Sequence, residues 1–192
     1  MTKYFVQSQE NKKLPKDIQD QLDALVADVY KYLVAHKITI DNTHEVVYLA
    51  GYNVQGTVVY IDRRLPRYLT LKDGRKIDLY KYLIIHEVGE KILEDHLGYK
   101  YPYAHEYVTG NLERRAVEND KIDWEEYQDF MLKEVQQLKT FSESPSDLDT
   151  KPEKDTHDYY RFHKIEKMKK KSKKKVVSFI SRLLEKYTVK GY

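Results

Sequence analysis

Apolar residues recur every three or four positions over several long stretches of the chain, the period of an α-helix with one buried face. The first stretch predicts one helix from about Pro15 to His36, with the proline in the first turn. Its inward face is aliphatic and consists of Ile18, Leu22, Leu25, Val26, Val29 and Leu33. This helix therefore needs a partner to cover that face.

Three further helices follow the same period between residues 78 and 141. The second begins after an aspartate cap and ends at a glycine, and the third begins with a proline. Asp123 and Glu126 have the spacing of a capping box for the fourth. The expected bounds are Asp78 to Gly98, Pro102 to about Asn119–Asp120, and Trp124 to about Phe141.

A short β region separates the first two helices. Gly56–Asp62 is β-branched and predicts a strand, while Tyr68–Asp78 predicts a hairpin around an Asp-Gly turn. The pattern of Glu45–Ala50 fits a strand or a helix, and we favour a strand. The chain is therefore expected to be α+β and mainly α, with four helices and a small antiparallel sheet.

The C-terminal part of the chain has a different composition. Residues 142–158 are polar and contain two prolines, which is typical of a linker. Residues 159–192 predict a basic helical tail, with an apolar face at Val176–Leu184 after a run of lysines. We therefore divide the chain into a domain at 1–141, a linker at 142–158 and a tail at 159–192.

The formal net charge of +3 conceals an asymmetry between these parts. Residues 1–141 carry 20 basic and 23 acidic side chains, whereas residues 142–192 carry 14 and 8. There is no cysteine, which excludes disulfides, thiolate metal sites and a cysteine nucleophile. No apolar run approaches the length of a membrane span. A metal ion would have to be held by His, Asp and Glu.

Two of the predicted helices carry ionisable residues on their inward faces. On the second helix, His86 and Glu90 occupy central positions of the apolar stripe, one turn apart, with Cβ atoms about 5–6 Å from each other. On the third helix, His105 lies in the stripe and Glu113 lies at its edge. These four side chains can converge on one cation. Two imidazoles with one or two carboxylates suit Zn²⁺, and Mn²⁺ or Fe²⁺ are alternatives.

The string His86-Glu87-Val88-Gly89-Glu90 resembles the H-E-x-x-H helix of zincin metallopeptidases, except that a glutamate replaces the second histidine. The stretch from Tyr60 to Asp123, about a third of the chain, is also similar to small phage and prophage proteins. There an Arg-Arg-Leu-Pro-type turn precedes a His-Glu helix, and an Ala-His helix and a capped Asp-Trp or Asp-Tyr helix follow. The matching elements here are Arg63–Pro66, the helix at His86, Ala104-His105 and Asp123-Trp124.

The resemblance implies a zinc-dependent hydrolase, most plausibly a peptidase acting on a peptide or protein. His86, Glu90 and His105 would hold the ion, and Glu87 would be the general base for a water at the open position. Glu113 as a fourth ligand would close the site and favour a structural role. Tyr101 or Tyr103 is the candidate to stabilise an oxyanion. We expect such a protein in the cytoplasm of a bacterial host or in a virion.

Other interpretations stay open at this point. His86–Glu90 and His105–Glu113 can be buried ion pairs that join the helices, with Glu87 facing solvent beside Lys91. The protein would then be a non-enzymatic interaction or virion-associated protein of phage type. Its tail, with nine Lys/Arg and one acid in Arg161–Lys175, could bind nucleic acid, a partner or an anionic lipid surface.

The arginines after the predicted strand also have two interpretations. Arg63 and Arg64 can hold a carboxylate or phosphate of a substrate, or they can form an exposed basic turn.

Overall fold

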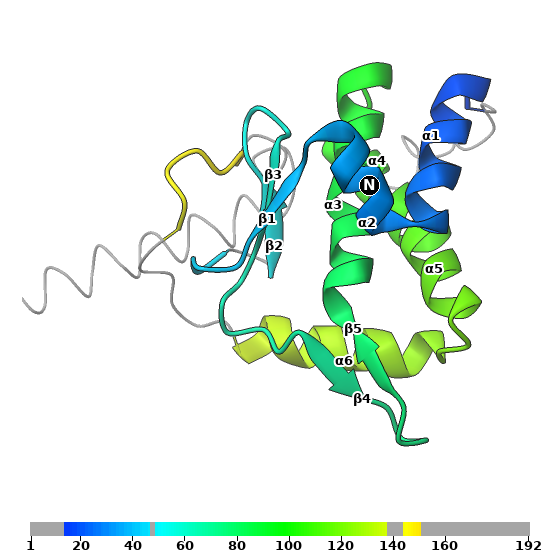
Figure 1. Cartoon of the computed structure of the whole chain (residues 1–192), viewed down its shortest axis with the longest axis vertical. Helices are drawn as coiled ribbons and strands as arrows, with labels where there is room; N and C mark the ends of the chain where they lie inside the picture. The colour runs from blue at the N-terminus through cyan, green and yellow to red at the C-terminus, as the bar shows by residue number, and fades with distance from the viewer. Residues whose placement is uncertain (1–13, 47–48, 138–143, 151–192) are drawn as a thin grey trace, which may run out of the picture. The chain divides into compact units, whose positions relative to one another are not determined.

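A computed structural model describes residues 14–46, 49–137 and 144–150 of the chain (Figure 1). Its first compact unit is Met1–Pro152. The described part is mainly helical with small sheets, which confirms the α+β, mainly α class. The predicted tail helix at 159–192 lies outside the described residues.

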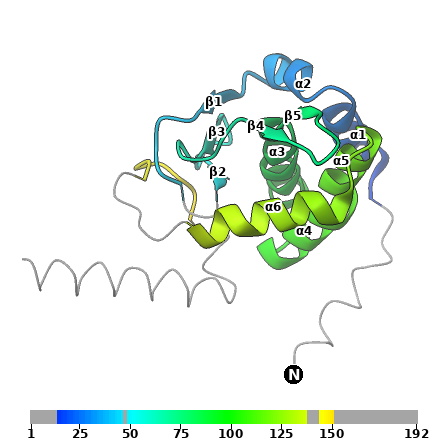
Figure 2. The same ribbon diagram turned by 90° about the horizontal axis from the view of Figure 1, so that it is seen from below.

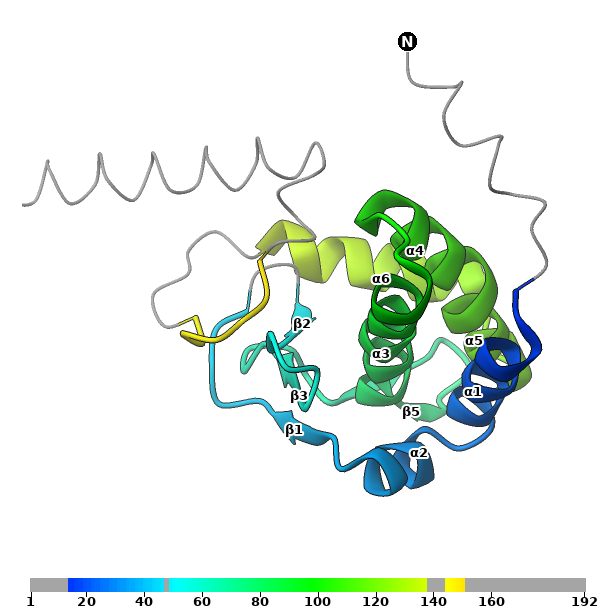
Figure 3. The same cartoon turned by 90° about the horizontal axis from the view of Figure 1, so that it is seen from above.

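The central element is α3 (Leu79–Leu97), which follows the predicted bounds. Asp78 caps it by accepting from the Tyr80 N–H, and Gly98 ends it with a left-handed φ of 64°. The sheet lies on one side of α3 and helices lie on the others, as Figure 3 shows. The prediction of a single inward face is therefore wrong, because neighbours bury α3 almost all round. Its buried residues are Leu79, Tyr80, Tyr82, Leu83, Ile84, Ile85, His86, Glu87, Val88, Gly89, Glu90, Ile92 and Leu93.

The predicted first helix is two helices, α1 (Lys16–Ala27) and α2 (Val29–His36). Asp28 breaks it by adopting an extended φ of −154°, and its carboxylate accepts from the Lys31 N–H. This is the N-cap arrangement, in which a short acidic side chain stabilises the start of a new helix. Because the apolar stripe continues across this break, the periodicity of the sequence does not reveal it.

The three-stranded sheet has the order β1-β3-β2, with β3 in the centre. The predicted strand at Gly56–Asp62 is β3, and its Val59 and Ile61 are buried. The parallel pairing of β1 with β3 was not predicted, because β1 is short and mostly exposed. The strand favoured at Glu45–Ala50 begins only at its last residue. The bounds are β1 Thr39–Asp41, β2 Ala50–Tyr52 and β3 Val58–Ile61.

The predicted hairpin is confirmed as β4 (Tyr68–Thr70) paired with β5 (Lys76–Asp78). Its turn contains Gly74 at a φ of 87°, a conformation that suits glycine. This antiparallel hairpin leads directly into α3.

The predicted third helix spans its expected range but contains a wide turn. It consists of α4 (Tyr101–Tyr107), the π-helical η1 (Val108–Glu113) and α5 (Arg114–Asn119). The fourth helix, α6 (Trp124–Gln137), crosses below α3 and is seen lengthwise in Figure 2. Its predicted end at Phe141 lies outside the described residues.

Asp123 caps α6, accepting from the Glu126 N–H at 2.8 Å, as predicted. The Glu126 carboxylate accepts from the Lys72 N–H at 3.0 Å, so it joins α6 to the turn of the hairpin.

Residues 144–150, which belong to the predicted linker, lie against the sheet. We call residues 145–149 the edge segment, because they run along β2. The Asp149 N–H donates to the Tyr52 carbonyl at 2.9 Å, and the Val54 N–H donates to the Asp147 carbonyl at 3.0 Å. Leu148 is buried between them.

Candidate metal centre

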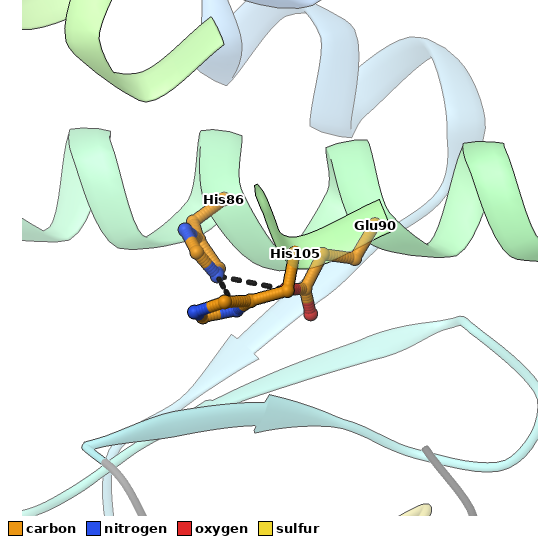
Figure 4. A group of neighbouring side chains, drawn as sticks. All are labelled: His86, Glu90 and His105. Atoms are coloured by element: carbon orange, nitrogen blue, oxygen red, sulfur yellow. Dashed lines mark hydrogen bonds and ion pairs between the residues drawn. The ribbon is translucent and has the colours of Figure 1, made fainter. Parts of the chain in front are cut away.

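Three of the predicted ligands meet at one point between two helices. The Glu90 Oε1 atom lies 2.9 Å from His86 Nε2 and 2.7 Å from His105 Nδ1. The two ring nitrogens lie 3.1 Å apart. Figure 4 shows His86 and Glu90 extending from α3 to His105. One ligand atom from each side chain therefore converges on the same small volume.

A glycine lets the two helices approach at this level. A Cβ atom on Gly89 would lie 2.9 Å from Leu112 Cδ1 and 3.2 Å from Val108 Cγ2, both on η1. The first distance is shorter than real Cβ atoms tolerate. The glycine inside the His86–Glu90 turn thus allows the neighbouring helix to bring His105 to the site.

Glu113 does not join the three converging atoms. Its Oε2 lies 2.8 Å from His86 Nδ1, the opposite ring nitrogen, and its Oε1 accepts from the Tyr127 hydroxyl at 2.6 Å. A carboxylate at this nitrogen fixes the orientation and tautomer of an imidazole whose other nitrogen binds a metal. Glu113 is thus in position to orient His86, and its expected role as a ligand has no geometric support.

The wide turn η1 explains why Glu113 faces α3. Eight residues of regular α-helix would turn Glu113 about 80° away from His105. A π-helical turn absorbs one residue, so seven effective steps leave the two side chains only about 20° apart. The turn thereby aligns Glu113 with His105, instead of leaving it at the edge of the stripe.

The site is strongly polarised. The side chains of His86 and Glu90 are 11% and 4% exposed, and that of His105 is 47% exposed. Burial alone would lower the pKa of His86, but the carboxylates of Glu90 and Glu113 raise that pKa well above its ordinary value. Burial would also raise the pKa of Glu90, but His86 and His105 hold that pKa below its ordinary value. The charges of the two carboxylates thus favour the protonated form of His86, and the two histidines favour the ionised form of Glu90.

The geometry nearly fits a small divalent cation. Metal bonds of about 2.0–2.1 Å in a tetrahedral site need ligand atoms about 3.3–3.4 Å apart. The three observed separations are 2.7 to 3.1 Å, so they must widen by about 0.2 to 0.7 Å. His105 is half exposed and lies on the seven-residue α4, so movement of its ring can widen its separations from His86 and Glu90. The 2.9 Å between His86 Nε2 and Glu90 Oε1 must widen by a change in one of those two side chains.

Glu87, the predicted general base, is buried with 9% exposure. The interpretation that it faces solvent is therefore wrong, and Lys91 pairs with Asp95 at 2.8 Å. Glu87 lines a pocket of about 280 Å³ between α3 and the sheet, together with Tyr52 and residues of α2. Glu87 thus follows His86 directly in the sequence and lies on the side of α3 that faces the sheet.

The two candidate tyrosines lie in different places. The Tyr101 hydroxyl is 3.4 Å from His105 Nδ1, so Tyr101 borders the site. Tyr103 packs against the rings of Tyr99 and Tyr107. Tyr101 thus contacts one of the predicted ligands, His105.

Two further tyrosines were missed from the sequence. Tyr127 supports Glu113, but only the fold brings α6 to this position. Tyr52 donates to Glu94 Oε2 at 3.0 Å, and burial raises the pKa of Glu94 to about 7 despite this bond. Glu94 follows His86 and Glu90 at the same four-residue spacing, and that repeat was a detectable signal.

Of the buried pairs proposed as an alternative, His86–Glu90 is confirmed at 2.9 Å, whereas Glu113 pairs with His86 and not with His105. His86 contacts both Glu90 and Glu113, and His105 contacts Glu90. Arg63 and Arg64 lie in an exposed turn, which confirms the interpretation of an exposed basic turn, and both form ion pairs there. Arg64 pairs with the fully buried Asp62 at 2.6 Å, and Arg63 pairs with Glu45 at 3.0 Å.

Searches against protein-family models, curated proteins and solved structures find no match to this chain. Within the described ranges, no helix has the length and apolar character needed to cross a membrane.

Proposed function

We propose that the protein is a metal-dependent hydrolase of zincin-like type, most plausibly a peptidase. The observation that carries this proposal is the convergence of His86 Nε2, Glu90 Oε1 and His105 Nδ1 within 3.1 Å of one another. The carboxylate of Glu113 behind His86 adds the supporting contact that metal-binding histidines commonly have.

Zinc is the cation that best suits two imidazoles and one carboxylate, and Mn²⁺ or Fe²⁺ are alternatives. Bound there, it would supply Lewis acidity and a water of lowered pKa. The protein residues would do the rest: Glu113 would accept a hydrogen bond from the Nδ1–H of His86 and so leave Nε2 free to bind, and Glu87 would take a proton from the attacking water. Tyr101 donates to the oxygen that becomes negative. The substrate is a peptide or protein.

Metal content and two substitutions test this proposal. The purified chain is expected to take up one Zn²⁺, and His86→Ala is expected to lower the affinity at least about 100-fold because it removes a ligand. Glu87→Gln should keep the affinity and abolish hydrolysis of an unfolded protein substrate. Calorimetry and elemental analysis measure the first effects, and peptide release measures the second.

His96→Ala is the matched control, since His96 is an exposed histidine at the end of the same helix. It should bind Zn²⁺ as the unchanged chain does. A folded protein that takes up no Zn²⁺, Mn²⁺ or Fe²⁺ contradicts the proposal, as does equal uptake by His86→Ala.

We also propose, as the second candidate, a non-enzymatic protein of phage type in which this helix pair is a structural unit. The charge of Arg161–Lys175 favours it, with nine basic residues and one acidic residue. Such a density of lysine binds phosphate backbones without sequence preference. The host cytoplasm or a virion would be its location.

A further inference from the structure

The strand β2 is an edge strand of its sheet, and the edge segment binds its outer edge. It pairs with β3 on one side only, as the last strand in the order β1-β3-β2. On its other side, the Tyr52 carbonyl and the Val54 N–H point outward and bind the edge segment. Asn53 and Leu148 thereby form an antiparallel β-bridge. Exposed edges of this kind accept extended peptides.

The edge also recognises side chains. Leu148 packs with Val46 and Tyr60, and its Cδ1 atom lies 2.8 Å from where a Cβ atom on Gly51 would be. Because Gly51 of β2 has no side chain, there is space beside it for Leu148.

The residue before Leu148 is recognised by polar groups. Asp147 Oδ1 accepts from the Tyr60 hydroxyl at 2.7 Å, and Asp147 Oδ2 accepts from the Asn53 amide at 3.4 Å. The edge thus has contacts for an acidic residue followed by an apolar one.

We propose that the outer edge of β2 is a binding surface for an extended peptide with an acidic residue followed by an apolar one. The edge segment is its intramolecular occupant and excludes other peptides from it. This goes beyond the proposed function, because the surface lies on β2 and needs no metal ion.

The contacts explain why the surface is closed to other chains until the edge segment leaves. A tethered segment acts at a millimolar effective concentration, so a free peptide of equal affinity competes poorly. The edge segment and α3 contact the same residue. The segment bonds to the backbone of Tyr52, whose hydroxyl donates to Glu94 one turn beyond Glu90.

The test uses the full chain labelled with ¹⁵N and a capped synthetic peptide of residues 144–150. Leu148→Asp places a charge in the apolar space and should release the edge segment. We expect about 1 mM peptide to shift the Tyr52–Val54 amide signals in Leu148→Asp, with an apparent affinity about ten-fold or more above that of the unchanged chain. Leu132→Asp, at an exposed leucine of α6, is the control and should behave as the unchanged chain.

Unchanged amide signals of α3 establish that each variant is folded, and Leu148→Ala is the milder variant should Leu148→Asp unfold. Adding Gly51→Ala to the released variant should abolish peptide binding, because the new methyl group fills the space of the leucine. The proposal is overturned if the released and unchanged chains respond equally, if neither responds, or if Gly51→Ala leaves binding intact.

Discussion

At the scale of single residues, a short chain of contacts determines how His86 is held. Tyr127 donates to Glu113, and Glu113 lies against His86 Nδ1. Burial, together with the charge of Glu113, raises the pKa of Tyr127 well above its ordinary value. The phenol therefore stays protonated and keeps donating throughout the pH range in which the protein is handled.

Removal of that hydroxyl is expected to weaken both stability and metal binding. In Tyr127→Phe, Glu113 Oε1 is left buried without its donor, which should lower the free energy of unfolding by about 1–3 kcal/mol. With Glu113 less constrained, Zn²⁺ affinity should fall by about 10-fold or more. Urea unfolding and zinc titration measure the two effects.

Tyr107→Phe, on α4, is the control and should leave zinc affinity unchanged, since its ring packs on Tyr103 and not on the site. Equal losses in both variants would show that Tyr127 does not act on His86 through Glu113.

The sequence identified the three converging residues because helical spacing alone brings His86 and Glu90 together and turns His105 inward. It did not reveal the place of Glu113, since periodicity assumes regular α-helix and the wide turn shifts the angle. Nor did it reveal Tyr127, whose contact depends on how α6 crosses the unit. Local geometry was predictable here, whereas contacts between distant helices were not.

At the scale of elements, the contact between α3 and η1 depends on Gly89. Glycine in a helix is normally a weakness, and replacement by alanine stabilises an exposed helix by about 1 kcal/mol. At Gly89 the new methyl group would meet Leu112 and Val108 at 2.9 and 3.2 Å. Steric overlap outweighs the gain in helix propensity.

Gly89→Ala is therefore expected to destabilise the protein by about 1–3 kcal/mol, as overpacking does, and to weaken zinc binding because His105 moves away with η1. Thermal unfolding and zinc titration test this. The same change at Gly110, where a Cβ atom meets nothing within 4 Å, provides the comparison. Gly110→Ala should be neutral or stabilising. Equal losses of stability in the two variants would contradict the steric role of Gly89.

Capping residues predicted the element boundaries well where their chemistry is local. Asp78, Gly98 and Asp123 all act at the ends where the sequence suggested them. The break at Asp28 and the parallel strand β1 were missed for different reasons. The apolar stripe of α1 continues into α2, so periodicity does not show the break between them. The strand β1 has three residues and is too short to show an alternating pattern of apolar and polar residues.

At the scale of the whole molecule, charge and packing divide the chain near the same point. Residues 1–152 carry 21 basic and 26 acidic side chains, whereas residues 153–192 carry 13 and 5. Because the edge segment is bound to β2, a cut after Phe141 would also remove part of the first unit. The informative truncation ends at Pro152, the last residue of that unit.

The full chain is expected to bind duplex DNA in a way that weakens at least about ten-fold between 50 and 200 mM salt. The chain ending at Pro152 should not bind. Fluorescence anisotropy with a labelled duplex measures both.

Replacement of residues 169–171 and 173–175 by glutamine in the full chain separates charge from length, since all six are lysines. This variant should lose most of its affinity for duplex DNA. Equal binding by the truncated chain, or binding that ignores salt, rejects this role for the tail.

The wide turn between His105 and Glu113 has a consequence for recognising the same centre in other sequences. The π-helical turn accommodates one residue more than regular α-helix would between two side chains that face the same way. A relative that lacks the extra residue could keep both side chains in place with an ordinary helix and a shorter interval. A search that demands one fixed interval between histidine and glutamate would miss such relatives, so the motif should tolerate a gap at this position.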